Sequence, residues 1–564
     1  MSHSLQARLY AKVAEDPQRK CLAFIDGHGE FIWQSRGQFY SRAAAYASSL
    51  GDVGCEAGDV CILVLPSDEF CATMLLAILI RGAAPLLIAP PILQQGPNSN
   101  LLQILKGVLE RTSPKVVIAH DSLEKFSAEL AQEHHGSVFL FGEKGIPLGT
   151  PMSGGPVTPS ENATFGLQLT SGTTGFPRIC VWQQRNVLAA LDGMADSMGL
   201  TDDDICFNWT PLYHDMGLVN NFFLCLSKGL PLAMLRPTDF VKQPARWLKG
   251  LHDTESTITW SPNFGYAISA QRIKDRDIAG IDLGHVRSFW NAAERIHLDT
   301  VLAFHDRFKS NGVRRGSLKM NFGCAENVGG ATFSALDKPF VYEHVDVKKF
   351  HEEGIAERVP ESRKEQAIAI VGAGRPHPNL RIKISSGNGE FLPDGHIGEV
   401  LLETPSRMTN YLGQADETSS VLRGDFISTG DLGYTRNGEL FWTGRIRERM
   451  TVRGKKIDPS EFEGQLLKNK NLRPGCFAVF GIDDQRLGTQ RLVLITELRN
   501  AHVNGLQNLT GDIREQLNLS LNLNVSEILL VEKGALTKTS SGKRRHQHFK
   551  SLYLNDSLKP LYKG

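Results

Sequence analysis

The sequence has no long uninterrupted apolar segment and no excess of charge of one sign. Its most apolar stretch, residues 70–91, contains Arg81, Gly82 and three prolines, so it predicts a buried helix and strand rather than a membrane span. Lysine plus arginine (62) nearly balances aspartate plus glutamate (61), which leaves a net charge of +1. We therefore expect neither nucleic acid nor an anionic membrane as the main partner.

Two further absences bear on location. Residues 1–8 lack the basic segment and apolar core that a secretory signal requires. The nine cysteines are scattered, odd in number and without a C-x-x-C pair, which favours reduced thiols over disulfides or a zinc site. We expect a cytoplasmic protein whose cysteines have structural roles.

The composition is that of a folded globular protein. Apolar residues make up 41% of the 564 positions and charged residues 22%, and no low-complexity tract argues for disorder. The length exceeds what one hydrophobic core normally serves, so it predicts several packed subdomains. No internal repeat is visible.

Short apolar runs alternate with helical stretches over most of the chain. Residues 60–65, 69–81 and 85–89 read as strand, helix and strand, a βαβ unit. The theme repeats in the runs 115–119, 138–141, 231–235 and 257–260, with a helix over 245–252. The bulk of the chain is therefore predicted to be α/β.

The pattern of predicted elements changes from about residue 367. Short alternating strands such as 381–384 and 399–403, separated by Gly-Asn-Gly and Pro-Asp-Gly turns, predict a small antiparallel barrel or sheet. After residues 440–444 a basic segment, 445–456, leads to a helix near 459–468 and a strand at 476–480. We place a domain boundary at Arg445–Arg449, which gives domains 1–445 and 446–564.

The first motif that carries chemistry is Leu169–Arg178. Two glycines let backbone amides approach an anion, Thr170, Ser171, Thr173 and Thr174 add hydroxyl donors, and Arg178 adds positive charge, a combination suited to a polyphosphate. The motif differs from a Walker A loop. The alternative for such a string alone is a Ser/Thr/Gly surface turn.

Three weaker motifs follow. In Asn321–Glu326, the carboxylate of Glu326 is suited to Mg²⁺ and the ring of Phe322 to stacking on a purine. In Ser428–Tyr434, Asp431 is suited to the vicinal hydroxyls of a ribose, with Arg445 assisting. In Thr537–Lys543, the ammonium of Lys543 is suited to neutralising charge that develops on an α-phosphate. Taken singly, each string also fits a solvated turn or loop.

Together and in this order, the four strings resemble the core motifs of the acyl-adenylate-forming superfamily, which holds acyl-CoA synthetases, nonribosomal adenylation domains and luciferases. Within it the chain looks most similar to fatty acyl-AMP ligases, through residues 209–218, 261–266 and 291–294. The resemblance implies a large N-terminal domain of two α/β sheets plus a distorted β-barrel, and a small mobile α+β C-terminal domain.

The resemblance also implies roles for single residues. It assigns Thr170, Ser171, Gly172, Thr173, Thr174 and Gly175 to the phosphate loop, with Arg178 beside it. It makes Ala293, Phe322 and Gly323 neighbours of the adenine, Asp431 and Arg445 the ribose pair, and Glu326 the Mg²⁺ ligand. Lys543 becomes the adenylation lysine and Arg447 the hinge between the domains. His214 and the strand Ser261–Tyr266 are expected to border the acyl site.

Residues 340–366 resemble the insertion that is associated, in fatty acyl-AMP ligases, with poor use of free CoA. The predicted function is therefore ATP- and Mg²⁺-dependent activation of a fatty or related carboxylate as acyl-AMP, with transfer to the phosphopantetheine of an acyl carrier protein in lipid or natural-product biosynthesis. One alternative is an acyl-CoA synthetase, which uses CoA as acceptor. The other is an adenylate-binding protein with impaired adenylation, because Arg178 and Ile179 stand where the family usually shows lysine and glycine and Ile179 would lie near the phosphates.

Overall fold

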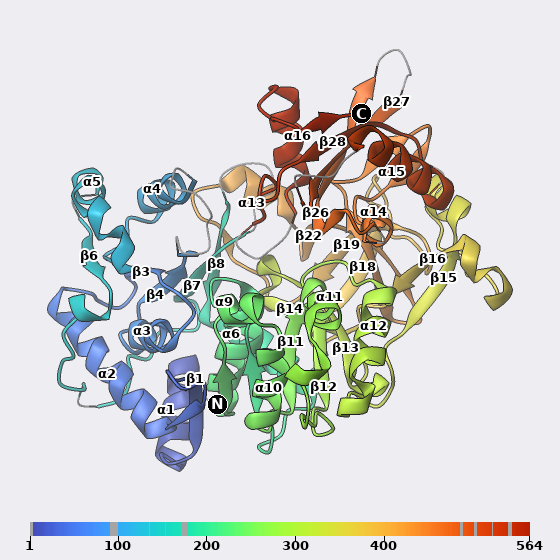
Figure 1. Cartoon of the computed structure of the whole chain (residues 1–564). Helices are drawn as coiled ribbons and strands as arrows, with labels where there is room; N and C mark the ends of the chain where they lie inside the picture. Colours follow the sequence, from blue (N-terminus) through green and yellow to red (C-terminus); the bar gives the residue numbers. More distant parts are fainter. Residues whose placement is uncertain are drawn as a thin grey trace.

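The computed structural model describes residues 4–90, 100–134, 136–152, 154–170, 177–467, 469–484, 489–500, 505–521, 523–539 and 544–564. Two α/β sheets and a small barrel form a large body, which runs from α1 to the end of β23, and a smaller part lies above it (Figure 1). We call the smaller part, from Met450 to Lys563, the C-terminal lobe.

The first sheet has the strand order β20-β8-β7-β4-β3-β5-β6, and its central strands are parallel. Helix α3, whose first turn is capped by the Asp68 side chain, is buried at every residue from Phe70 to Ile80. The elements of this unit are β3 (Val60–Val64), α3 (Glu69–Ile80), β4 (Ala84–Leu87), α4 (Asn100–Thr112), β5 (Val116–Ala119), α5 (Ser127–Glu133), β6 (Val138–Phe141), β7 (Thr164–Leu169), β8 (Ile179–Gln183) and β20 (Asn410–Tyr411).

The second sheet has the order β17-β14-β13-β12-β11-β9-β10-β1-β2, with a parallel centre and antiparallel edges. Its strands are β1 (Lys20–Ile25), β2 (Phe31–Ser35), β9 (Cys206–Asn208), β10 (Leu232–Met234), β11 (Ile258–Pro262), β12 (Ser288–Ala292), β13 (Leu318–Cys324), β14 (Gly329–Phe333) and β17 (Arg375–Pro376). Its helices are α1 (Leu5–Glu15), α2 (Arg36–Asp52), α6 (Gln184–Met198), α7 (Asp215–Gly217), η4 (Leu218–Phe223), α8 (Leu224–Lys228), α9 (Pro237–Lys242), α10 (Ala245–Asp253), α11 (Asn263–Arg272) and α12 (Leu298–Phe308).

The barrel consists of β18 (Arg381–Ser385), β19 (Gly398–Glu403), α13 (Ala415–Val421), β21 (Leu422–Arg423), β22 (Phe426–Arg436) and β23 (Glu439–Arg445). A separate hairpin, β15 (Tyr342–Asp346) with β16 (Ala367–Val371), packs against it through an apolar cluster that joins Val345 and Phe350 to Tyr434 and Phe441. The segment that resembles the insertion therefore contains a strand and a hydrophobic contact of its own.

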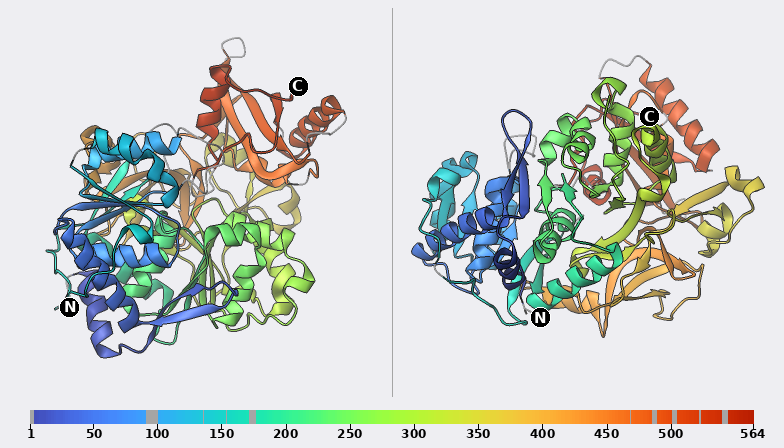
Figure 2. Two further views of the ribbon diagram at one scale, coloured as in Figure 1. Left: turned by 60° about the vertical axis from the view of Figure 1, so that its left-hand side comes forward. Right: turned by 90° about the horizontal axis from the view of Figure 1, so that it is seen from below.

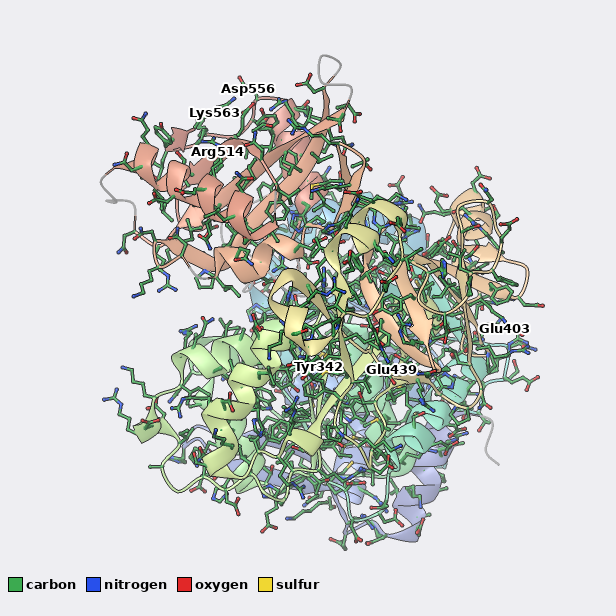
Figure 3. The ribbon with its side chains drawn as sticks, turned by 90° about the vertical axis from the view of Figure 1, so that its right-hand side faces the viewer. Tyr342, Glu403, Glu439, Arg514, Asp556 and Lys563 are labelled. Carbon is green, nitrogen blue, oxygen red and sulfur yellow. The ribbon has the colours of Figure 1, made fainter. Side chains whose placement is uncertain are left out.

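The C-terminal lobe has a sheet of order β26-β27-β28-β29, with helices packed on it. Its elements are β24 (Met450–Val452), β25 (Lys455–Ile457), α14 (Glu461–Leu466), β26 (Leu472–Asp484), β27 (Thr489–Leu498), α15 (Leu506–Leu521), β28 (Val525–Val531), α16 (His546–Leu554) and β29 (Tyr562–Lys563). Figure 2 shows the lobe standing above the body. In Figure 3, Arg514 and Lys563 mark the lobe, whereas Tyr342 and Glu439 lie in the body.

The predicted fold class is confirmed: two α/β sheets, a small barrel and a separate α+β lobe. The helix and the strand predicted in the apolar stretch 70–91 are α3 and β4, and no helix in the described ranges has both the length and the hydropathy of a membrane span. One local prediction is wrong. Ser261–Tyr266 is not a strand throughout, because β11 ends at Pro262 and α11 begins at Asn263.

Candidate functional site

A cavity of about 720 Å³ lies where the two sheets, the barrel and the start of the C-terminal lobe meet. The carboxyl ends of β7, β12 and β13 open into it, which is where parallel α/β sheets usually bind ligands. Nine predicted site residues line this cavity: Thr170, Arg178, His214, Ala293, Phe322, Gly323, Glu326, Asp431 and Arg445. Ser171, Gly172, Thr173, Thr174, Gly175 and Lys543 lie outside the described residues.

The predicted ribose pair is set by the register of one hairpin. Asp431 on β22 stands opposite Arg445 on β23, and Arg445 Nε donates to Asp431 Oδ1 at 3.1 Å. Trp442 Nε1 donates to the same oxygen at 3.2 Å. Asp431 is only 2% exposed, and its charge raises the pKa of Arg445. The buried carboxylate is thus fixed as a hydrogen-bond acceptor that can receive sugar hydroxyls.

The predicted neighbours of the purine lie at the ends of β12 and β13. Ala293 follows β12 with φ of 70°, a left-handed conformation that is uncommon for a residue other than glycine. Phe322 presents its ring beside Trp442, with 6.3 Å between the ring centres. Gly323 must be glycine here, because a Cβ would lie 2.3 Å from the carbonyl oxygen of Gly329. These residues form a narrow apolar slot suited to a flat base.

The phosphate side joins three segments that are distant in sequence. Glu326 follows β13 and accepts a hydrogen bond from the hydroxyl of Tyr411. The Arg178 guanidinium lies 4.4 Å from the centre of the Tyr411 ring and 3.8 Å from Glu326 Oε1. Burial, together with the charge of Glu326, raises the pKa of Tyr411, so this phenol stays protonated as a donor. Thr170 Oγ1 is buried without a hydrogen-bond partner among the described residues.

These groups fit a nucleotide with Mg²⁺. A magnesium ion that bridges phosphates takes one or two carboxylates from the protein and keeps waters and phosphate oxygens as its other ligands. Glu326 supplies one cavity-facing carboxylate, and within the described ranges no cluster of His, Cys, Asp and Glu forms a complete cage that would hold a metal alone. The orphaned hydroxyl of Thr170 is also explained if a phosphate oxygen accepts its proton.

The remaining wall of the cavity comes from α7, η4 and the β13–β14 turn. His214 Nδ1 lies 2.7 Å from Asp215 Oδ1, and Met216 follows on the cavity side. Cys324 lines the same wall, and burial raises the pKa of its thiol. Ser261–Tyr266 does not line the cavity, because Ser261 and Tyr266 are buried behind it.

Charged groups join the C-terminal lobe to the body beside the cavity. Arg544 donates to both oxygens of Glu463, at 2.8 and 2.9 Å, and His297 Nε2 lies 2.9 Å from Glu463 Oε2. Burial alone would raise the pKa of Glu463, but Arg544 and His297 outweigh it and hold that pKa well below its ordinary value. Nearby, burial raises the pKa of Glu294, which lines the cavity and accepts from the Phe264 amide at 2.7 Å.

Two expectations from the sequence are corrected or extended. Ile179 does not approach the phosphates: it is fully buried among apolar residues of the first sheet and does not line the cavity. Tyr411 and Trp442 were missed. A tyrosine on an edge strand carries no local signal, whereas an indole three residues before Arg445 in a hairpin with Asp431 could have been noticed.

The two-sheet body, the barrel and this cavity define an adenylate-forming ligase. The profile of the AMP-binding enzyme family matches residues 9–412, so the chain belongs to that family. The prediction of an acyl-adenylate-forming enzyme, made from the four motifs, is therefore confirmed.

Individual relatives agree with this assignment. The chain is 26% identical to 4-hydroxyphenylalkanoate adenylyltransferase of Mycobacterium marinum over 99% of this chain and 92% of that protein. It is 28% identical to medium-chain-fatty-acid–[acyl-carrier-protein] ligase JamA of Moorena producens over 78% of this chain and 76% of that protein. A solved structure from a study of fatty acyl-adenylate ligases from E. coli and L. pneumophila has the same fold, with a TM-score of 0.88, 24% identity and coverage of 98% of both chains.

Proposed function

We propose that this chain activates a fatty or related acyl carboxylate with ATP and transfers the acyl group to the phosphopantetheine arm of an acyl carrier protein. In the first step a carboxylate oxygen attacks the α-phosphorus of ATP, which forms acyl-AMP and releases pyrophosphate. The observation that carries the proposal is the cavity whose lining brings together, from distant segments, the residues that we assign to the ribose, the purine and the Mg²⁺ ion.

Each described wall has a role in this reaction. Asp431 and Arg445 hold the ribose, and Ala293, Phe322 and Gly323 flank the purine. Thr170 and Arg178, with residues 171–175, bind the phosphates. Because Arg178 has a fixed fork of donors, it can hold two phosphate oxygens where a lysine would offer a point charge. His214 lies on the wall from which the acyl carboxylate approaches.

Glu326 would hold the Mg²⁺ ion, with Tyr411 orienting its carboxylate. When bound, the ion neutralises charge on the phosphate oxygens and the leaving pyrophosphate. We assign the complementary charge on the α-phosphate side to Lys543. Support for this role comes from its described neighbour Arg544, which pairs with Glu463 at the boundary between the lobe and the body.

The second step requires the acceptor thiol to reach the acyl-AMP. We propose domains 1–445 and 446–564, with Arg447 as the hinge, so that rotation of the C-terminal domain exchanges one catalytic face for another. No apolar cluster of described residues contains members from both sides of this boundary. The name of the Moorena relative, an acyl-carrier-protein ligase, and the β15–β16 hairpin favour a carrier protein over CoA.

Acid-dependent exchange of labelled pyrophosphate into ATP tests the first step. Mass spectrometry with ATP and a panel of carboxylates, supplied with either CoA or a phosphopantetheinylated carrier protein, tests the second. Acylated carrier without acyl-CoA supports the proposal, whereas acyl-CoA as the main product identifies an acyl-CoA synthetase. Binding of acyl-AMP without exchange for any acid would contradict the proposed activity and favour an adenylate-binding protein.

A further inference from the structure

One section of the cavity wall lies around α7, η4 and the β13–β14 turn. Its lining residues are His214, Met216, Asn220, Cys324 and Gly329. The acyl group is placed in this section, because these residues take no part in the contacts assigned to the ribose, the purine and the phosphates. This assignment rests on the proposed function, and it allows the substrate class to be narrowed.

Asn220 offers a hydrogen-bond donor at this end. It lies in the π-helix η4, a geometry that often occurs at functional sites, and it is only 5% exposed. The amide of Gly330 donates to its Oδ1 at 3.2 Å. Since a backbone N–H can only donate, the side-chain atom that faces it must be oxygen, which fixes the orientation of the carboxamide. No described residue accepts a hydrogen bond from the remaining Nδ2.

Asn321 offers an acceptor beside it. Its Nδ2 donates to the carbonyl oxygen of Thr332, so its Oδ1 is the atom left over, and no described residue donates to that oxygen. Asn321 is 4% exposed and also lines the cavity. Both asparagines adjoin Gly330, where a Cβ would lie 3.0 Å from Asn321 Nδ2. The two buried carboxamides therefore leave one donor and one acceptor in the same region.

Densely packed apolar side chains lie behind Asn220. Val219, Phe222, Met194 and Val328 are fully buried in the largest apolar cluster, and none of them lines the cavity. A Cβ on Gly329 would lie 2.5 Å from Asn220 Oδ1 and 3.3 Å from Val219 Cγ1, so the turn and η4 are in close contact. A long alkyl chain could pass this point only by displacing a packed core.

We infer that the carboxylate activated here is short and carries an oxygen substituent, a hydroxyl or oxo group, that accepts a hydrogen bond from Asn220 Nδ2. A hydroxyl also donates, and Asn321 Oδ1 is its acceptor. An unsubstituted chain of the same length leaves both buried amide groups unpaired, which is the arrangement by which a binding site rejects an analogue that lacks a polar group. Asn220 is a specificity-determining residue for this substrate class.

The test uses hydrolysis-resistant acyl-sulfamoyl adenosines, which mimic acyl-AMP and need no turnover. Calorimetry on the full chain compares the butanoyl compound with its 2-, 3- and 4-hydroxy forms and with the dodecanoyl compound. We expect at least one hydroxybutanoyl compound to bind about 10-fold or more tightly than butanoyl, and dodecanoyl to bind most weakly. The inference is overturned if no hydroxylated compound exceeds butanoyl, or if dodecanoyl binds as tightly as butanoyl.

Variants of Asn220 test whether this residue causes the preference for hydroxylated compounds. Asn220→Leu keeps a similar volume without a donor, and Asn220→Asp keeps the acceptor for Gly330 without the donor, so both should reduce the hydroxyl preference to about 2-fold or less. The control is Asn221→Leu on the same π-helix: Asn221 does not line the cavity, so the preference should persist even if stability falls. A preference unchanged in both Asn220 variants would remove Asn220 from the role.

The outcomes separate this inference from the proposed function. Selective binding without pyrophosphate exchange would defeat the proposed activity and leave the inference standing. Exchange that is fastest with dodecanoate would defeat the inference and leave the activity standing. Failure of every analogue to bind would defeat both.

Discussion

The two sheets of the body pack against each other through apolar side chains, whereas the C-terminal lobe contacts the body through charged and polar side chains. One apolar cluster contains Leu63 and Leu75 of the first sheet unit together with Trp260 and Trp290 of the second sheet. Between the lobe and the body, the described residues make polar side-chain contacts, which include His297 with Glu463, His351 with Glu461, and Arg295 with Ser460. The described apolar clusters of the lobe stay within the lobe.

This difference in packing predicts that the two sheets stay together while the lobe can move. Pulling the two sheets apart would expose a large apolar surface to water, at a cost of roughly 25 cal/mol per Å². The polar contacts of the lobe can exchange their partners for water, so undocking costs far less per unit area. The residues proposed for the ribose and the purine therefore lie in the firmly packed body, which agrees with the proposal that the lobe moves relative to them.

The largest effect is expected where the lobe supplies chemistry. Lys543→Ala should slow acid-dependent pyrophosphate exchange by about 10²–10³-fold, because it removes a preorganised charge from the transition state. Affinity for AMP should change little, since the ribose and purine walls are intact. Exchange of labelled pyrophosphate into ATP measures the rate, and calorimetry measures the affinity for AMP.

The matched control is Lys538→Ala in the same loop, which should retain most of the exchange rate. Unchanged exchange in Lys543→Ala would show that Lys543 is not the catalytic cation. The distinction between a body that binds the nucleotide and a lobe that supplies catalytic charge would then be wrong.

The next effect concerns the rigid body. Asp431→Ala should weaken AMP binding by about 10–100-fold, since it removes charged hydrogen bonds to the ribose and leaves the partly exposed Arg445 without its carboxylate partner. Calorimetry with AMP measures the loss. Asp431→Asn is the conservative control and should retain part of the affinity through its remaining carbonyl oxygen. Equal affinity in all three proteins would place the ribose elsewhere.

The boundary itself gives the third prediction. Glu463→Gln removes the carboxylate charge that faces His297 across the boundary, whereas its other partner, Arg544, lies within the lobe. Losing a partly buried, charged contact of this kind costs on the order of 2 kcal/mol. The lobe should therefore spend more time undocked, which an energy-transfer pair with one dye on the body and one on the lobe would report. Glu527→Gln is the control, because its partners Arg491 and Lys563 lie within the lobe.

Docking should also depend on pH with a defined sign. Arg544 of the lobe and His297 of the body both lower the pKa of Glu463, and only the share due to His297 depends on docking. That share is fully present above the ordinary value of 4.5 and is lost as pH falls below that value toward the lowered pKa. His351, together with neighbouring Arg295, likewise lowers the pKa of Glu461 against the opposing effect of burial. Acid should increase undocking in the unmodified protein more than in Glu463→Gln. An acid response of equal size in both would show that Glu463 does not hold the boundary.

The smallest effect is expected at Tyr411. Tyr411→Phe removes one hydrogen bond to Glu326 and keeps the ring beneath Arg178, so the Mg²⁺ concentration needed for half-maximal exchange should rise about fivefold. Tyr342→Phe serves as the control, because Tyr342 on β15 does not line the cavity. No change in the Mg²⁺ requirement would indicate that the carboxylate is oriented without the phenol.

Much of the fold and of the site could be read from the sequence. Strand runs such as Val138–Phe141 and the helix beginning at Glu69 are set by local apolar periodicity and capping, and the structure has them where they were expected. Asp431 and Arg445 were identifiable because a hairpin fixes their pairing over a few residues. The hydroxyl-rich loop and Glu326 were recognised because phosphate and Mg²⁺ need those groups.

Tertiary packing decided the rest. Ile179 was expected beside the phosphates, but the alternation of side chains along β8 turns it into the core, and only the sheet fixes that phase. Tyr411 meets Glu326 because an edge strand added from the barrel side pairs with β8, a contact across more than two hundred residues that no local pattern encodes. The donor of Asn220 at the acyl end likewise exists only because η4 and the β13–β14 turn meet there. Local chemistry therefore determined which groups this chain offers a nucleotide, and long-range packing determined which of them face it.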